Sequence, residues 1–234
     1  ALVVSFVGEV VLDRPGLGLT LSRPGAAVDA GEGAPLAPRP PACEPSRLVG
    51  EAIERAWRVC RARSSLELEV SRLWSGEHVG RQATLSLALD DESLSLEIEA
   101  IFHDDAAPAA PPGSTWALWE HEVVEVFLLG EDDHYTEIEI GPHGHYLVLR
   151  LEGRRNIVAR DLPLVVERLS VDRARARWRA AARLDAALLP KRPLWYNAYA
   201  IHGRADARRY LAHAAVPGPA PDFHRLESFR LFAP

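Results

Sequence analysis

The stretch that decides the fold runs from Leu118 to Asn156 and reads LWEHEVVEVFLLGEDDHYTEIEIGPHGHYLVLRLEGRRN. Its runs of valine, isoleucine and aromatic residues, bounded by turn residues, predict consecutive strands at 122–129, 135–140 and 146–151. In the second turn, Gly141-Pro142-His143-Gly144, the proline presets φ and the closing glycine accepts a positive φ. Short turns make these strands an antiparallel meander, which needs a second sheet to cover its apolar face.

The flanking sequence supplies strands for that second sheet. Apolar and polar residues alternate in the segments 66–70, 85–89 and 94–100, which predicts strands with one dry and one wet face. Further short strands are expected at 164–169, 195–201, 209–211 and 227–232, and one helical turn at 185–190. About ten short strands with only marginal helices predict an all-β fold, an antiparallel β-sandwich of the jelly-roll or immunoglobulin-like type.

The segment 171–183 carries conflicting signals. Arginines at every second position from Arg173 to Arg179 alternate with alanines and Trp178, which is a strand pattern, whereas alanine and arginine both favour helices. Because the alternation persists over the whole run, we predict a single strand whose inner face carries Trp178.

Residues 1–63 differ in composition from the rest of the chain. They are dominated by Ala, Gly, Pro, Arg and Leu, and the stretch GEGAPLAPRPPACEPS lacks the residues that form a core. Within them, segment 48–63 can place Leu48, Ile53 and Trp57 on one helical face. We therefore predict a low-complexity, flexible arm at 1–63 with a short helix at 48–63, followed by a β-sandwich domain at 64–234.

Charge and hydropathy limit the partners of the chain. Its net charge is -6 and its arginines are scattered, whereas nucleic-acid binding requires a clustered basic surface. No apolar stretch reaches the roughly 18 residues of a membrane span, so we expect neither nucleic acid nor a membrane as partner. The compartment stays open, with a reduced, cytoplasmic setting favoured because Cys43 and Cys60 both precede the strand-rich region.

A series of motifs from about residue 66 to the C-terminus resembles family 9-like carbohydrate-binding modules, which share a sandwich with the DOMON group. The motifs are Trp74-Ser75-Gly76, Phe102-His103-Asp104-Asp105, the Leu118 to Phe127 run, Gly141-Pro142-His143-Gly144, Gly153-Arg154-Arg155-Asn156, Ala200-Ile201-His202-Gly203 and Pro221-Asp222-Phe223-His224. Within that set, the chain is most similar to an uncharacterised vertebrate family built on one such module. The resemblance implies a jelly-roll sandwich and non-catalytic binding of saccharide-like ligands.

Loop and sheet-face residues would form the ligand site: Trp119, Glu122, Glu125, Tyr135, His143, Arg155, His202 and His224. The charged groups would hydrogen-bond sugar hydroxyls, and Trp119 would stack on an apolar sugar face. Glu122 and Glu125 point to opposite sides of their strand, so one of them faces inward and needs a donor. A strand-end ion pair is the simpler interpretation of such a carboxylate.

Two neighbouring groups of polar residues leave alternatives open. Glu137 and Glu139 share a strand face with Tyr135, which predicts a solvated face or, alternatively, a shallow polar groove with an aromatic floor. His143 and His145 could begin a metal site, but zinc needs three or four protein ligands, so turn and edge histidines are the simpler interpretation. We expect no metal and no cofactor, with calcium as the remaining alternative, since loop carboxylates are available at Asp104, Asp105, Asp132 and Asp133.

The sequence contains no nucleophile elbow, phosphate loop or dinucleotide fingerprint. We therefore expect no catalytic residues and a non-enzymatic binding module for a carbohydrate or another small polar ligand. The alternative is an intracellular protein-interaction or structural domain, in which the same side chains pair with one another and leave no open groove. A metal-dependent hydrolase is a third, weaker hypothesis.

Overall fold

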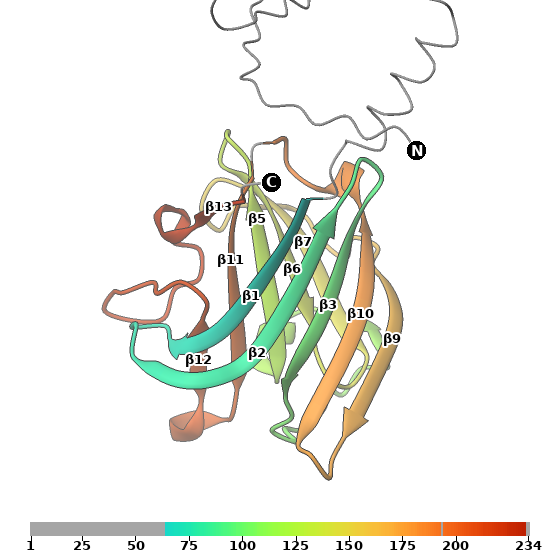
Figure 1. Cartoon of the computed structure of the whole chain (residues 1–234), viewed down its shortest axis with the longest axis vertical. Coiled ribbons are helices and arrows are strands. Elements are labelled where there is room, and N and C mark those ends of the chain that lie inside the picture. Colours follow the sequence, from blue (N-terminus) through green and yellow to red (C-terminus); the bar gives the residue numbers. More distant parts are fainter. Residues whose placement is uncertain (1–63, 193, 233–234) are drawn as a thin grey trace, which may run out of the picture. The chain divides into compact units, whose positions relative to one another are not determined.

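The computed structural model of the chain describes residues 64–192 and 194–232 (Figure 1). The predicted arm, its helix at 48–63 and both cysteines lie outside these residues. In the described part, thirteen strands form one hydrogen-bonded sheet in the order β4-β7-β6-β5-β11-β12-β1-β2-β3-β10-β9, with β13 on β11 and β8 on β7. The pairs are antiparallel except β4 with β7. The predicted all-β class is confirmed.

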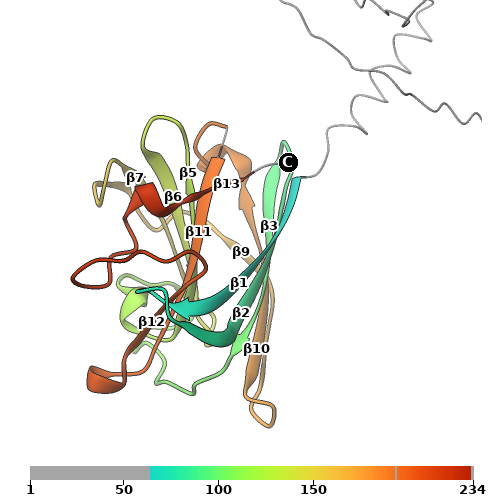
Figure 2. The same ribbon diagram turned by 60° about the vertical axis from the view of Figure 1, so that its left-hand side comes forward.

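The sheet folds over on itself at β12 (Arg209–Ala212), which pairs with β11 on one side and with β1 on the other. Figure 2 shows the two layers that result. The first layer contains β1 (Ser64–Leu73), β2 (His78–Leu89), β3 (Ser93–Ile101), β10 (Arg177–Asp185) and β9 (Val165–Asp172). The second contains β4 (Gly113–Ser114), β7 (His145–Glu152), β6 (His134–Ile140), β5 (Val123–Leu129) and β11 (Leu194–His202), with β8 (Ile157–Ala159) and β13 (Arg230–Phe232) at its margins.

The main core fills the space between the two layers. Alternate residues of β2, such as Leu85 and Leu87, are buried on one side, and Val124 and Val126 of β5 are buried on the other. Trp178 of β10 belongs to the same cluster and is almost fully buried, as its alternation with alanines predicted. Burial of alternate residues is the reason that period two in the sequence identified these strands.

The second layer is also covered on its outer face. A second apolar cluster contains Phe127, Leu149 and Ile201 on the strands, together with Phe223 and Phe229 from the C-terminal segment. As a result, all seven residues of β5 are buried, including its single carboxylate. The outer face of this layer is where the candidate site lies.

The segment 171–183 corrects one prediction. It is strand at both ends, as predicted, but not one strand: β9 ends at Asp172, a turn follows at 173–176, and β10 begins at Arg177. The carboxylate of Asp172 accepts hydrogen bonds from the Arg175 backbone N–H (3.0 Å) and guanidinium (2.7 Å), and Ala176 has a positive φ of 49°. An aspartate that bonds the backbone a few residues on stabilises a turn, and this local effect overrides the continuous alternation.

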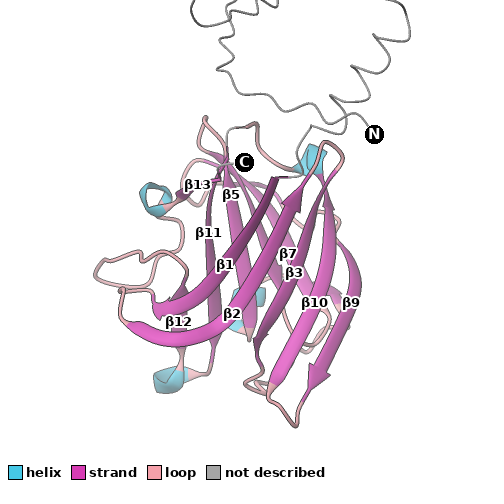
Figure 3. Ribbon diagram, in the orientation of Figure 1, coloured by secondary structure: helices cyan, strands magenta, loops and turns pink. Residues whose placement is uncertain are grey.

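Within residues 64–192 and 194–232, four short 3-10 helices connect the strands (Figure 3). They are η1 (Leu118–Glu120), η2 (Ala186–Leu188), η3 (Ala205–Ala207) and η4 (Leu226–Ser228). The second confirms the predicted helical turn at 185–190, and the Asp185 carboxylate caps it by accepting from Ala187 N–H at 2.8 Å. None of the helices in the described ranges is long and apolar enough to cross a membrane.

Candidate functional site

A cavity of about 340 Å³ opens on the outer face of the second layer. Strands β5, β6, β7 and β11 form its floor, and the segment 221–224 forms one wall. Its lining combines four kinds of side chain: aromatic, aliphatic, acidic and basic. They are Trp119, Glu125, Phe127, Glu137, Leu149, Leu151, Arg155, Ile157, Ile201, Tyr210, Pro221, Asp222, Phe223 and His224.

Three glutamates lie side by side beneath this cavity. Glu125 of β5 is directly opposite Glu139 of β6, and Phe127 is opposite Glu137, so alternation places all three carboxyl groups on the same outer face. Their exposed fractions are 2% for Glu125, 3% for Glu137 and 0% for Glu139. The prediction that Glu137 and Glu139 form a solvated face is therefore wrong, because the C-terminal segment and η1 cover that face.

Burial changes the protonation of these carboxyl groups. Desolvation raises the pKa of Glu137 to about 8, and it raises the pKa of Glu125 and Glu139 well above the usual value for a glutamate. Mutual repulsion adds to the effect, since the charge of Glu125 raises the pKa of Glu139 further. At neutral pH the cluster therefore carries protons, and it can donate as well as accept hydrogen bonds.

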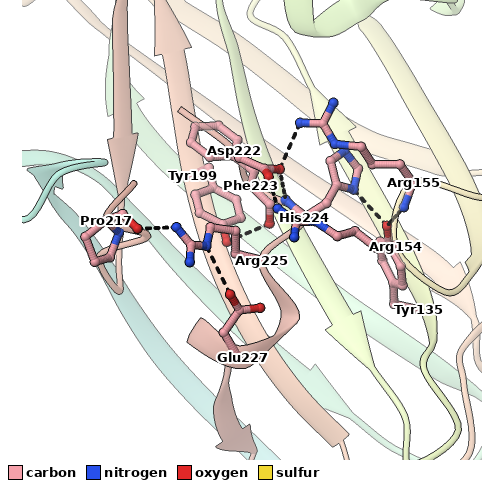
Figure 4. Close-up of polar contacts among 10 residues, drawn as sticks. All are labelled: Tyr135, Arg154, Arg155, Tyr199, Pro217, Asp222, Phe223, His224, Arg225 and Glu227. Atoms are coloured by element: carbon pink, nitrogen blue, oxygen red, sulfur yellow. Dashed lines mark hydrogen bonds and ion pairs between the residues drawn. The ribbon is translucent and has the colours of Figure 1, made fainter. Parts of the chain in front are cut away.

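The segment 221–224 is anchored over the strands by aromatic and ionic contacts (Figure 4). The ring of Phe223 stacks on Tyr199 of β11 with centroids 3.9 Å apart, and the Tyr199 hydroxyl donates to the Phe223 carbonyl oxygen at 3.0 Å. Asp222 accepts from Arg155 at 2.8 Å and also pairs with Arg154, and these guanidinium groups hold the pKa of Asp222 below its usual range against desolvation. These contacts fix one wall of the cavity.

Tyr135 connects this wall to the floor. Its hydroxyl oxygen accepts from the Arg155 backbone N–H at 3.1 Å and lies 2.8 Å from Nδ1 of His224. Desolvation lowers the pKa of His224 to about 4, so the imidazole is neutral at pH 7. With Nδ1 accepting from Tyr135, the remaining proton is assigned to Nε2, which gives the cavity a hydrogen-bond donor.

Trp119 is held in place by Arg208. The guanidinium of Arg208 donates to the carbonyl oxygens of Trp119 and of Glu120 (2.9 Å), and it also bonds the Tyr210 hydroxyl at 3.1 Å. Trp119 and Tyr210 both line the cavity as a result. The indole of Trp119 meets the exposed Trp116 edge to face at 5.0 Å.

Of the residues predicted for the site, Trp119, Glu125, Arg155 and His224 line the cavity, and Tyr135 bonds His224 behind it. The other three lie elsewhere. Glu122 is buried and accepts from the backbone N–H groups of His103 (2.9 Å) and Asp105 (3.2 Å). It therefore anchors the loop that follows β3.

His202 and His143 also support this loop rather than the cavity. The His202 ring stacks on that of His103 with centroids 3.5 Å apart, and desolvation lowers the pKa of His202 to about 4. Nε2 of His143 lies 3.0 Å from the Asp105 carbonyl oxygen, and that of His145 lies 2.9 Å from the Ala110 carbonyl oxygen. The two histidines of the predicted pair thus bind separate backbone groups. Across the described ranges, no three His, Cys, Asp or Glu side chains are grouped so as to hold a metal ion.

Several cavity residues were not predicted from the sequence. Tyr210 and Phe223 reach the site from the chain end, which the pattern treated as a short strand and a closing loop. For Glu125 a signal was present: its strand, β5, is otherwise apolar on both faces, which is typical of a strand covered on both sides. A strand of this kind buries any carboxylate that it carries.

Comparison with known proteins gives the relatives of this chain. No family model matches the sequence. The human UPF0462 protein C4orf33 is 36% identical over 177 residues, which cover 71% of this chain and 87% of the human protein.

Among solved structures, the fold is similar to that of a "putative carbohydrate-binding protein" from Bacteroides uniformis, with a TM-score of 0.51 and 16% identity over 77% of this chain and 90% of the other. A family 9 carbohydrate-binding module from Caldicellulosiruptor kristjanssonii, in complex with cellotriose, matches at a TM-score of 0.36 and 16% identity over 63% of this chain and 72% of the other. The resemblance to a vertebrate single-module family is confirmed by the human relative, and the chain belongs to the UPF0462 (C4orf33) family.

Proposed function

We propose that the chain is a non-catalytic module that binds a small, hydroxyl-rich ligand of the saccharide class in the cavity under the segment 221–224. One observation carries this proposal: the cavity joins aromatic walls to buried carboxyl groups with unpaired oxygens. Glu125 Oε1 and Glu137 Oε2 are buried without a hydrogen-bond partner, and both residues line the cavity. Buried polar atoms normally have partners, so carboxyl groups of this kind in the lining of a cavity favour a ligand that hydrogen-bonds them.

The chemistry of the walls fits a sugar ring. Trp119, Tyr210 and Phe223 offer aromatic surface on which the C–H face of a pyranose can stack. The cavity, at about 340 Å³, lies near the lower end of the roughly 300–1,000 Å³ that is typical of small-molecule sites. The solved protein with the same fold is described as a "putative carbohydrate-binding protein", and the proposal gives this chain a ligand of the same class.

The arrangement favours binding over hydrolysis. A glycosidase places one protonated and one ionised carboxyl group on either side of the scissile bond. Glu125 and Glu137 instead project from neighbouring strands on the same floor, and desolvation raises the pKa of both. The ionised carboxylate in the wall, that of Asp222, is paired with Arg154 and Arg155 and is therefore not free to act opposite a proton donor.

Isothermal titration calorimetry of the full chain with a panel of mono- and disaccharides tests the proposal. We expect binding of at least one saccharide at millimolar concentration or below, and loss of that binding in Trp119→Ala and Glu125→Gln. The matched control is Glu131→Gln, an exposed turn residue. Absence of binding across the panel would contradict the proposal and favour a structural or protein-interaction domain.

A further inference from the structure

Strand β9 forms a long open edge of the first layer. Among the described residues it pairs with β10 alone, and it ends the strand order beyond that strand (Figure 1). The other end of the order is β4, which has two residues, whereas β9 has eight. A long edge strand is a template for pairing with a further strand, and natural proteins normally keep such edges short or covered. The edge of β9 is therefore a candidate interaction surface.

The hydrogen-bond pattern determines which residues of β9 face this edge. The Phe102 backbone N–H donates to the Ala176 carbonyl oxygen at 3.0 Å, just where β10 begins beside β3. Backbone groups of successive residues in an antiparallel sheet point to opposite neighbours, so residues 178 and 180 of β10 also face β3. Their partners in β9 are Val171 and Leu169. The N–H and carbonyl groups of these two residues thus point away from β10, toward the open edge.

The side chains along this edge divide by character between the two faces of the sheet. Leu169 and Val171, each 36% exposed, lie on the side that faces the core. Arg168, Ser170 and Asp172 alternate with them and lie on the outer side. The edge therefore carries apolar groups on one face and, on the other, a positive and a negative charge on either side of a serine.

We propose that two copies of this chain pair through β9, antiparallel, about a two-fold axis that passes beside Ser170. In this arrangement Leu169 lies opposite Val171 of the second copy, and Val171 lies opposite Leu169 of the second copy. Each of these pairs can exchange both backbone N–H···O bonds, because its groups already point outward. Two-fold symmetry requires a self-complementary surface, and the edge of β9 meets that requirement.

The charges select this register over its neighbours. With the axis at Ser170, Arg168 lies opposite Asp172 of the second copy, and the symmetric pair repeats the contact. An axis at Leu169 would instead put Arg168 opposite Ser170, and an axis at Arg168 would put two arginines opposite each other, which is destabilising. The facing positions of Arg168 and Asp172 are of the non-hydrogen-bonded type, in which Cα atoms are about 4.5 Å apart and side chains are closest.

Both charged groups can accept a further partner. Arg168 bonds Glu97 at 3.2 Å with its side chain 75% exposed, and a guanidinium has five N–H donors. The Asp172 carboxylate accepts from the backbone and the side chain of Arg175, and its oxygens keep unused lone pairs. The cavity opens on the outer face of the second layer, whereas β9 belongs to the first, so the inference is independent of the proposed function.

Analytical ultracentrifugation of the full chain from about 1 to about 500 μM tests the inference, a range that covers weak dimers. We expect a monomer–dimer equilibrium. Val171→Pro removes an N–H that points to the open edge, and Arg168→Asp puts like charges opposite each other, so each should weaken dimerisation at least about tenfold. The matched control is Arg81→Asp, which changes an exposed arginine of β2 that pairs with Glu69 at 2.9 Å and should leave dimerisation unchanged. Circular dichroism checks that each variant folds.

Disulfide crosslinking tests the register. In a background that carries Cys43→Ser and Cys60→Ser, Ser170→Cys puts two thiols in facing positions with Cα atoms about 4.5 Å apart, within reach of a disulfide. Arg168→Cys leaves the two thiols offset along the strands. We expect oxidation to give a covalent dimer with the first substitution and not with the second. Crosslinking at 168, or its absence at 170, would overturn the axis at Ser170.

Two results would overturn the dimer itself. The first is a chain that stays monomeric across the whole concentration range. The second is a dimer that neither Val171→Pro nor Arg168→Asp weakens, since it would have to form through another face. The ultracentrifugation of the unaltered chain stands even where one of these variants fails to fold.

Discussion

Replacing Glu137 with glutamine should make the protein more stable at alkaline pH and weaken its dependence on pH. Desolvation raises the pKa of Glu137 to about 8, whereas in the unfolded chain it has its ordinary value of 4.5. Between these values the folded state binds more protons than the unfolded state, so stability falls as pH rises, by about 1.4 kcal/mol per pH unit for one proton. Glutamine has nearly the same shape and cannot ionise.

The window from pH 6.5 to 8 separates this effect from the titration of the buried histidines. The pKa values of His202 and His224 are lowered from 6.5 to about 4, so below pH 6.5 the unfolded chain binds more protons at these residues than the folded one. Their contribution to stability is therefore present above pH 6.5 and is lost as the pH falls below it. Across the window, the free energy of unfolding of Glu137→Gln relative to the unaltered protein should rise by up to about 2 kcal/mol. Urea denaturation at several pH values measures this difference, with Glu131→Gln as the control. A constant difference between variant and parent from pH 6.5 to 8 would refute the assignment of a buried, protonated Glu137.

Three further substitutions test the packing and the hydrogen bonds described above, each by urea denaturation. Trp178→Ala should cost about 3–5 kcal/mol because the indole is 1% exposed in the inter-layer core, whereas Trp116→Ala, at 47% exposed, should cost far less. Tyr135→Phe should cost about 1–3 kcal/mol, because the Arg155 backbone N–H and Nδ1 of His224 lose their hydrogen-bond partner. The same change should make the 221–224 segment more susceptible to proteolysis. Both Gly203 and Gly153 have a positive φ, but an added Cβ clashes with a backbone oxygen, that of Ala207, only at Gly203. Gly203→Ala should therefore cost more than Gly153→Ala, and equal costs would contradict the crowding.

The fold could be predicted largely because its strands bury alternate residues. The 122–129 run and its two successors appear as β5, β6 and β7, shifted by a residue at some ends. The 171–183 segment could not be predicted from alternation, because the reversal depends on the Asp172 carboxylate bonding the chain a few residues later. Such a local turn leaves the period-two pattern intact on either side.

The site could be predicted only in part, because it depends on a segment distant in sequence. Trp119, Glu125, Arg155 and His224 were expected and do line one cavity. The burial of Glu137 could not be read from its own strand, where alternation is typical of a wet face. It follows from the docking of residues 221–224 through Tyr199 and Asp222, and a sequence pattern does not specify which loop covers which sheet face.

Two glutamates of one strand region show why burial alone does not decide between structure and function. Glu122 and Glu125 are both buried, but each carboxylate oxygen of Glu122 accepts a backbone N–H, so its burial is satisfied within the chain. Glu125 lies on the opposite strand face, with an unpaired oxygen at a cavity and the carboxyl groups of Glu137 and Glu139 beside it. A core that needed only stability would carry an apolar residue at that position, as β7 does with Leu147 and Leu149 on the same face. The contrast therefore assigns Glu122 to the architecture of the sandwich, and it makes the cluster around Glu125 the place at which the proposed ligand binding is to be tested.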